Sequence, residues 1–257
     1  MDEVRIQYLR PEQVSKEKKR FPLALIPLGL IEWHGPHLPM GTDAINAENV
    51  AVGVARKLGG LVLPTLFNGT ERNRSADDLK KYGFDEYQYI EGMDFPGFPE
   101  KSFYWREEIL GIIIRNQITM ALERGYKYVY VISGHGAPNQ ADVLDRLCEE
   151  LNTTYPECRV GWSFAFSSST RTSGDISHAA AEETSLMYYY HPESVDVSRL
   201  PKKGPLKYMD YGIVDEWAFA GRPKTNDFTL STDYDPRTES SKEKGEKIYR
   251  EIVSEIA

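Results

Sequence analysis

The sequence has few cysteines, no long apolar run and no excess of basic residues. Its two cysteines, Cys148 and Cys158, are too few for a disulfide scaffold, and their spacing is not that of a metal-binding motif. No run reaches the roughly 18 apolar residues of a membrane span, so we expect no membrane partner. Residues 1–20 are polar and unlike a signal peptide, so a cytoplasmic location is expected.

The charge balance narrows the class of partner. The chain of 257 residues carries a formal net charge of −8, whereas proteins that bind nucleic acid usually present a basic face. We therefore expect no nucleic-acid partner. The length suits one large α/β domain that spans residues 1–257.

Short apolar runs alternate with helical patterns along the chain. The runs that predict buried strands are Ala24–Leu30, Gly60–Leu66, Tyr128–Ser133 and Arg159–Phe166. The segments with helical spacing of apolar residues are Asp43–Lys57, Phe103–Arg124, Asn139–Asn152 and Ser240–Ile256. This alternation predicts βαβ units and a parallel sheet that is covered on both faces.

Residues 67–102 do not follow this alternation. The segment is rich in aromatic residues and contains the turn-forming sequence FPGFP. A connection of this length without regular structure is uncommon and often functional. We consider three alternatives: an insertion packed on the surface, an aromatic lid, or a contact between subunits.

Candidate metal ligands follow the first predicted strand. Glu32 and His34 are two residues apart, so on an extended chain their side chains project to the same side. Asp43 lies beyond a turn and begins the next predicted helix. Ligands of open α/β sheets bind outside the carboxyl ends of the strands, which is where this segment lies.

Two further segments carry the same types of residue. His135 directly follows the third predicted strand and is flanked by Gly134 and Gly136. His178 precedes two glutamates, Glu182 and Glu183, near the start of a predicted helix. Four of the five histidines of the chain fall in these three segments, which a random distribution would seldom produce.

This set of side chains suits divalent metal ions. Carboxylates and imidazoles without thiolates favour zinc, manganese or another first-row ion such as iron. Glu32, Asp43 and one of the two later glutamates supply three carboxylates, and His34 and His135 supply two neutral imidazoles. These five groups exceed what one catalytic zinc usually takes from a protein. They fit two ions that are bridged by a carboxylate and a hydroxide.

At this point the sequence resembles the creatininase (creatinine amidohydrolase) family. The most specific match is EWHGPHLPMGTD, from Glu32 to Asp43. The other matching stretches are Ser133–Gly136, His178–Ala179, Glu183–Ser185, Phe95–Gly97, Asp235–Arg237 and Glu243–Glu246. The resemblance implies a three-layer α/β/α sandwich with a mainly parallel central sheet, a binuclear metal site and a homo-oligomer, with a hexamer favoured.

The resemblance also implies roles for individual residues. Glu32, Asp43 and His135 would hold one ion. His34, Asp43 and a glutamate would hold the other, so that Asp43 bridges the two. His178 would be an acid or base that faces the substrate.

The choice of the last glutamate depends on a departure from the family pattern. Ala137 stands where creatininase itself has a metal-binding glutamate two residues after the histidine, which weakens the case for creatinine as the substrate. The pattern of other members selects Glu183 as ligand and catalytic residue. If His178 were helical, however, Glu182 would share its face. We expect Glu183, with a helix that begins after His178, and keep Glu182 as the alternative.

These features predict a metal-dependent hydrolase. We expect a creatininase-type amidohydrolase that splits a C–N bond in a small, polar, cyclic substrate through a metal-bridging hydroxide. One alternative is a hydrolase that opens the ring of a keto-cyclitol or keto-sugar such as an inosose. Another is a non-catalytic protein that binds a metal or metabolite, although the intact set of ligands argues against it.

Overall fold

A parallel β-sheet forms the centre of the computed structural model, which describes residues 2–168, 178–206, 208–209, 212–213 and 231–257. Strand β1 (Leu23–Gly29) pairs on one edge with β4 (Tyr128–Ser133), which in turn pairs with β5 (Arg159–Phe164). On its other edge β1 pairs with β2 (Leu61–Val62) and β3 (Leu66–Phe67). All these pairings are parallel, so the carboxyl ends of the strands meet at one edge of the sheet.

The second apolar run forms two short strands rather than the single strand predicted for Gly60–Leu66. Leu63 still donates its N–H to the Leu25 carbonyl at 2.8 Å. Pro64 follows and has no N–H to donate, so the ladder is interrupted before β3 resumes it at Leu66.

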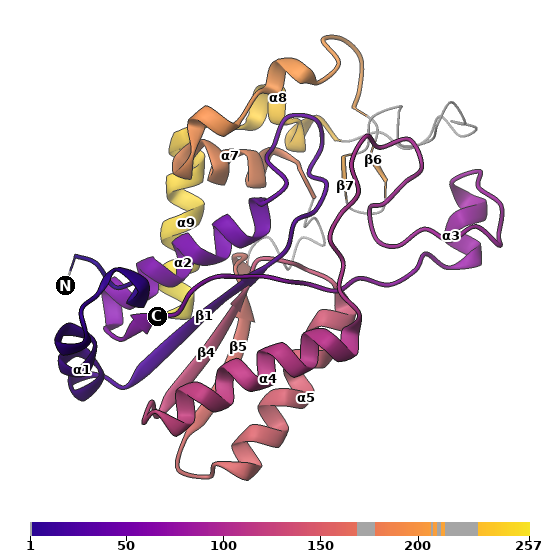
Figure 1. Ribbon diagram of the computed structural model, residues 1–257. Coiled ribbons are helices and arrows are strands. Elements are labelled where there is room, and N and C mark those ends of the chain that lie inside the picture. Colours follow the sequence, from indigo (N-terminus) through magenta and orange to yellow (C-terminus); the bar gives the residue numbers. More distant parts are fainter. Residues whose placement is uncertain (1, 169–177, 207, 210–211, 214–230) are drawn as a thin grey trace.

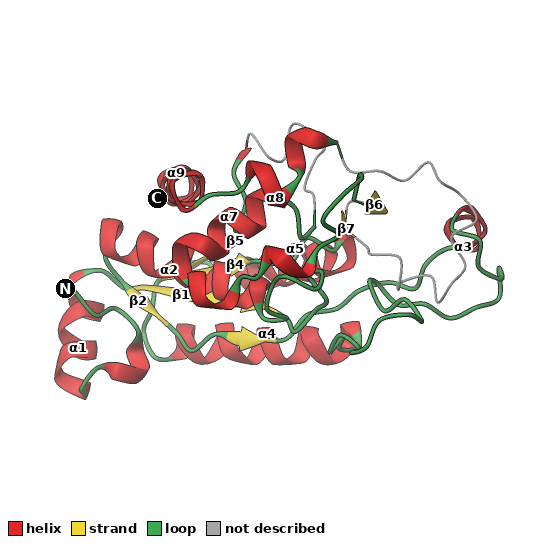
Figure 2. Cartoon of the chain, turned by 90° about the horizontal axis from the view of Figure 1, so that it is seen from above, coloured by secondary structure: helices red, strands yellow, loops and turns green. Residues whose placement is uncertain are grey.

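Helices cover both faces of the sheet (Figures 1 and 2). Ala24, Ile26 and Leu28 of β1 belong to a buried core with α4 (Glu107–Glu123) and α5 (Pro138–Thr154). Leu23 and Leu25 point the other way, into a core with α2 (Thr42–Leu58), α7 (Ala181–Tyr190) and α9 (Lys242–Ile256). The predicted three-layer α/β/α sandwich is confirmed.

Helix α1 (Pro11–Arg20) was not predicted from the sequence, because it carries no apolar stripe. It is stabilised instead by Pro11 in its first turn, Glu12 at its N-terminus and basic residues in its last turn. The remaining short elements are η1 (Ile6–Tyr8), α3 (Ala76–Lys81), η2 (Pro192–Ser194), η3 (Val197–Arg199), β6 (Tyr208–Met209), β7 (Gly212–Ile213), η5 (Thr232–Tyr234) and α8 (Pro236–Glu239).

Residues 67–102 build a small core of their own, which we call the aromatic cluster. Its buried members are Trp33, Leu79, Tyr82, Phe84, Ile90, Met93, Phe95 and Phe98. Trp33 comes from the loop after β1 and stacks on Phe98 with 4.3 Å between ring centroids. The segment begins at the last residue of β3 and contains α3, so it is a packed insertion. A role as a lid or subunit contact stays a prediction.

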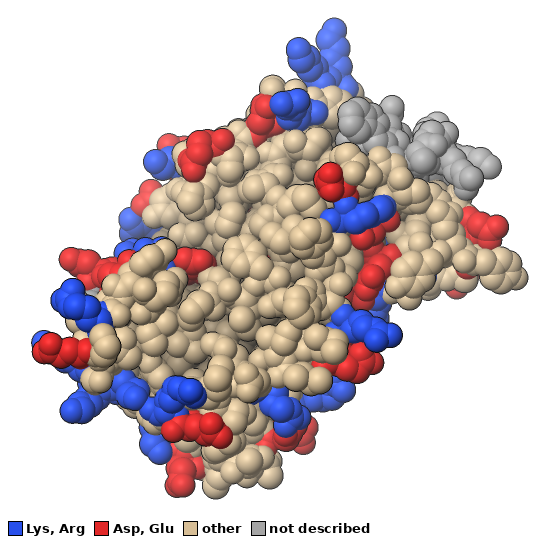
Figure 3. Space-filling model, viewed as in Figure 1, with Lys and Arg blue, Asp and Glu red and all other residues tan. Residues whose placement is uncertain are grey.

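The surface carries both signs of charge. On the face shown in Figure 3, Lys and Arg side chains are interspersed with Asp and Glu along the edge. Within the described ranges, no helix has the length and apolar character needed to cross a membrane.

Candidate metal centre

The carboxyl ends of β1 and β4 meet the N-terminus of α2, and two glycines permit this close approach. A Cβ atom on Gly29 would lie 2.4 Å from the backbone nitrogen of Ala44, and one on Gly134 would collide with the Asp43 carbonyl oxygen. Asp43 is therefore held in the first turn of α2, directly above the two strand ends. A carboxylate at this position is also stabilised by the helix dipole.

The two carboxylate oxygens of Asp43 face two different histidines. Its Oδ1 lies 3.0 Å from Nε2 of His34, and its Oδ2 lies 3.2 Å from Nδ1 of His135. The same Nδ1 atom of His135 lies 3.3 Å from Oε2 of Glu32. Asp43 thus stands between two groups of potential ligands, which is the arrangement expected of a bridging carboxylate.

Glu183, rather than Glu182, completes the second group. Helix α7 begins at Ala181, so His178 lies before the helix and the conflict over the two glutamates does not arise. Oε2 of Glu183 accepts the Ala179 N–H at 2.6 Å and lies 3.8 Å from Nε2 of His34. Ala179 adopts a φ of 60°, in the left-handed region that non-glycine residues seldom occupy.

The structure brings all the predicted site residues together. The three groups of side chains that could hold an ion are Glu32 with Asp43 and His135, His34 with Asp43 and Glu183, and Glu32 with His34 and His178. We call these six residues the polar cluster. That they bind metal stays a prediction at this stage.

Backbone carbonyls set the tautomers of both central histidines. Nδ1 of His34 donates to the Glu32 carbonyl at 3.0 Å, and Nε2 of His135 donates to the Thr70 carbonyl at 3.2 Å. A carbonyl can only accept, so each of these outer nitrogens carries a hydrogen. The inner nitrogen of each ring is left to face Asp43, as in metal-binding histidines.

The buried carboxylates of the polar cluster require positive charge nearby. Burial alone would raise the pKa of Glu32, but the neighbouring His135 and His178 outweigh this effect and lower it to about 2. Burial alone would lower the pKa of His34, but Asp43 and Glu183 raise it to about 10. Protons on the imidazoles can supply the positive charge, and metal ions can replace those protons.

The donor atoms fit divalent ions. Oδ2 of Asp43 is buried and accepts no hydrogen bond of good geometry within the described part of the chain. Carboxylate oxygens and neutral imidazole nitrogens are the ligands that zinc and manganese take in proteins.

His178 is oriented toward the same space. Its Nε2 donates to the carbonyl of Trp33, so Nδ1 is the free nitrogen, and it lies 3.9 Å from Oε2 of Glu32. Its side chain is 17% exposed, whereas that of His34 is 0% exposed. Among the histidines of the polar cluster, His178 is therefore the one that a bound molecule can reach most easily.

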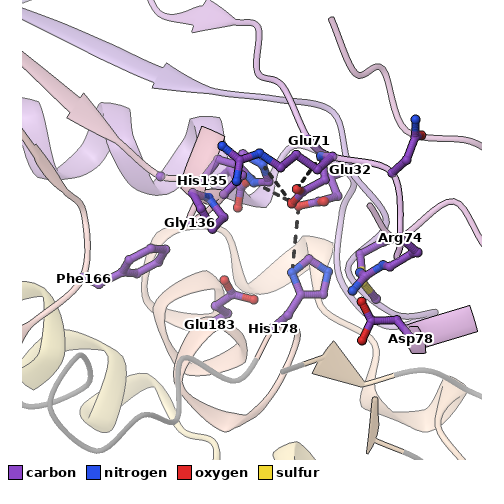
Figure 4. A pocket seen from close by; sticks show the side chains of 16 residues that line it. Glu32, Glu71, Arg74, Asp78, His135, Gly136, Phe166, His178 and Glu183 are labelled. Carbon is purple, nitrogen blue, oxygen red and sulfur yellow. Dashed lines mark hydrogen bonds and ion pairs between the residues drawn. The ribbon is translucent and has the colours of Figure 1, made fainter. Parts of the chain in front are cut away.

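A cavity of about 520 Å³ opens beside the cluster (Figure 4). Figure 4 shows His135, Glu32, His178 and Glu183 around a common space, with Arg74 and Asp78 farther along its wall. The described residues that line it are Glu32, Asp43, Glu71, Arg72, Asn73, Arg74, Asp78, Met93, Gly134, His135, Gly136, Ala137, Pro138, Phe166, His178 and Glu183. The volume suits a small molecule.

Three residues near the cluster were missed by the sequence analysis. Tyr104 donates its hydroxyl hydrogen to Oε1 of Glu32. This residue falls inside the helix predicted for Phe103–Arg124, whereas α4 begins at Glu107. Burial and the charge of Glu32 raise the pKa of this phenol well above its ordinary value, so it stays protonated. Thr70 and Glu71 follow β3, and a search beyond every strand end would have found them.

Comparison with known proteins agrees with this arrangement. The profile of the Creatininase family, described as creatinine amidohydrolase, matches residues 7–257. The chain belongs to the creatininase family. The predicted resemblance is thereby confirmed, and the chain is a metal-dependent hydrolase.

Two relatives in the creatininase family have known names. A creatinine amidohydrolase from Pseudomonas putida is 26% identical over 263 residues, which cover 91% of this chain and 86% of that protein. A mycofactocin precursor peptide peptidase from Mycobacterium ulcerans (strain Agy99) is 27% identical over 195 residues, or 72% of this chain and 65% of that protein.

Solved creatininase structures share the fold. A crystal structure of creatinine amidohydrolase (creatininase) has a TM-score of 0.70 at 22% identity and covers 100% of this chain and 96% of its own. Other similar structures are a mutant creatininase of the Zn-Zn type, a creatininase with Mn and a mutant creatininase complexed with creatine.

Proposed function

We propose that this protein is an amidohydrolase that uses two divalent ions to hydrolyse a small cyclic amide. Glu32, Asp43 and His135 would hold one ion, and His34, Asp43 and Glu183 the other. The observation that carries the proposal is the position of Asp43, whose two oxygens face different histidines at 3.0 Å and 3.2 Å. Solved creatininases of the Zn-Zn and Mn types make zinc or manganese the expected ions.

The side chains of this protein prepare the site and move protons. When bound, the ions supply a water nucleophile ionised near neutral pH and polarise the substrate carbonyl. The Glu32 and Thr70 carbonyls keep the inner nitrogens of His34 and His135 free to bind. His178, which exposes Nδ1 to the cavity, would accept a proton from the nucleophile and return it to the leaving nitrogen. Glu183 would assist as ligand and proton acceptor.

The proposed substrate class rests on the cavity and on the relatives. A lining with carboxylates, arginines and a few apolar side chains favours a small polar molecule over an extended apolar one. The names of both relatives describe hydrolysis of a C–N bond, in creatinine or in a peptide. Most aromatic side chains of residues 67–102 pack in the aromatic cluster, and Phe166 is the aromatic residue among the described lining.

A substrate screen tests the proposal. Protein loaded with Zn²⁺ or Mn²⁺ is incubated with cyclic amides, formamides, short peptides and keto-cyclitols, and products are followed by mass spectrometry. We expect hydrolysis of at least one cyclic amide, which is lost when His34→Ala removes a ligand and the fold is retained. Hydrolysis restricted to keto-cyclitols would favour the ring-opening alternative. Full activity of the His34→Ala variant would contradict the proposed site.

We also make proposals on the number of domains and on the oligomeric state of the protein. The cluster takes side chains from residues 32 to 183, so we propose one catalytic domain over residues 1–257. We also propose a homo-oligomer, with a hexamer favoured. Phe103, Ile109 and Ile112 are exposed apolar side chains at and just before the start of α4, and they support a subunit contact there. Light scattering coupled to size-exclusion chromatography measures the oligomer mass.

A further inference from the structure

The two carboxylate oxygens of Glu32 have different partners. Oε2 faces the polar cluster, at 3.3 Å from Nδ1 of His135 and 3.9 Å from Nδ1 of His178. Oε1 points away and accepts the hydroxyl hydrogen of Tyr104. The residue is 2% exposed, so water does not readily replace either partner.

The direction of the hydrogen bond from Tyr104 follows from its second contact. The backbone N–H of Met93 donates to the Tyr104 oxygen at 3.0 Å, which occupies the acceptor side of the hydroxyl. The hydroxyl hydrogen is therefore left for Glu32. Gly92, with a φ of +49°, leaves room for this contact, because a side chain there would collide with the Tyr104 hydroxyl.

Backbone contacts on either side hold Tyr104 between the loop that carries Glu32 and the segment that follows β3. The Phe103 N–H donates to the Ile31 carbonyl at 2.8 Å. The Trp105 N–H donates to the Gly69 carbonyl, also at 2.8 Å. Tyr104 is not among the described residues that line the cavity, so its influence on the reaction would be indirect. Its hydroxyl binds Glu32, and its ring lies 6.5 Å from the ring of His135, which belongs to the same group of proposed ligands.

We propose that Tyr104 is a positioning residue that engages Oε1 of Glu32 so that Oε2 alone is presented to a metal ion. This inference rests on the proposed function, because it assigns Glu32 as a ligand. The phenol would fix the carboxylate in one orientation, and the ion held by Glu32, Asp43 and His135 would depend on it. The ion held by His34, Asp43 and Glu183 would not.

Metal titration of metal-stripped proteins tests this inference without any substrate. Zn²⁺ and Mn²⁺ are titrated against a chelating dye into wild type, Tyr104→Phe and, as a matched control, Tyr126→Phe. Tyr126 is buried in the core beneath α4 and α5, and its hydroxyl has no hydrogen-bond partner within the described residues. In Tyr104→Phe we expect one of the two ions to bind about 10–100-fold more weakly, while the other is unchanged.

The results distinguish a failure of the positioning role from a failure of the proposed function. Tyr126→Phe should bind both ions like wild type, and Gly92→Ala, which displaces the phenol, should weaken the same ion as Tyr104→Phe. Unchanged or tighter binding by Tyr104→Phe, or an equal loss of both ions, would overturn the positioning role alone. Failure of the wild-type protein to bind ions would overturn the proposed function, and this inference with it.

Discussion

The polar cluster and the aromatic cluster lie side by side and share the loop after β1, but the positions of their side chains are determined in different ways. Glu32 points into the polar cluster, while its neighbour Trp33 is buried in the aromatic cluster. Glu32, His34 and His135 follow the ends of strands, whose positions are set by the sheet, and α2 and α7 bring Asp43 and Glu183 against them. The aromatic side chains are placed by mutual packing within one insertion. The geometry of the first region therefore depends on the sheet and its covering helices, whereas the geometry of the second depends on packing within the insertion.

The largest expected effect tests the center of the polar cluster. Asp43→Asn removes the charge of the proposed bridging ligand, so both ions should be lost and kcat/KM should fall by on the order of 10⁴-fold or more. The loss of ions is measured as metal content by mass spectrometry, and the loss of activity as turnover of the substrate found in the screen. The control is Asp77→Asn, an exposed carboxylate of α3, which should retain both ions. Two ions bound to Asp43→Asn would refute the bridge.

A smaller effect is expected for the proton-transfer residue. His178→Ala should lower kcat by about 10²–10⁴-fold, because general acid and base catalysis is lost, while the stronger ligands keep the ions. Steady-state kinetics and metal content are measured together. The exposed His191, changed to Ala, serves as the control and should behave like wild type. Loss of both ions from His178→Ala would make it a ligand rather than a catalytic residue.

The aromatic cluster should respond in stability rather than in metal binding. Phe95 is fully buried, so Phe95→Ala should lower the free energy of unfolding by about 3–5 kcal/mol. Tyr87, which is 87% exposed in the same insertion, should change it by less than about 0.5 kcal/mol when replaced by Ala. Urea denaturation measures both. A cost below about 1 kcal/mol for Phe95→Ala would show that the insertion is not a packed core.

The last expected effect is on the pH dependence of stability without metal. The pKa of His34 is raised to about 10 in the folded protein, from 6.5 in the unfolded chain. Its contribution to the free energy of unfolding is therefore complete below pH 6.5 and is lost as the pH rises toward 10. The pKa of Glu32 is lowered to about 2 in the folded protein, from 4.5 in the unfolded chain. Its contribution to the free energy of unfolding is therefore complete above pH 4.5 and is lost as the pH falls toward 2. The Tm of metal-free protein should therefore fall between pH 6.5 and 9.

Added metal should reverse this trend. Binding requires neutral imidazoles, so the increase in Tm caused by Zn²⁺ should grow as the pH rises over the same interval. Scanning fluorimetry with and without metal measures both curves. A metal-induced shift that shrinks with rising pH would contradict ligation by His34 and His135.

The difference between the regions explains how far the sequence could predict the structure. Glu32, His34 and His135 were predictable because each follows a strand whose carboxyl end meets the others in a parallel sheet. The choice of Glu183 over Glu182 needed the family pattern, and the start of α7 at Ala181 accounts for it. The contact of Tyr104 with Glu32 could not be predicted, because it depends on how the insertion folds back over the loop after β1. Likewise, β2 and β3 were predicted as one strand, because the apolar pattern runs through both and does not show that Pro64 interrupts the hydrogen bonds of the sheet.

The most direct test of the account is a crystal structure of the Mn²⁺- or Zn²⁺-loaded protein with anomalous scattering from the metal. We expect two anomalous peaks that share Asp43 as a ligand, one also held by Glu32 and His135 and the other by His34 and Glu183. A single peak, or two peaks without Asp43 between them, would contradict this arrangement.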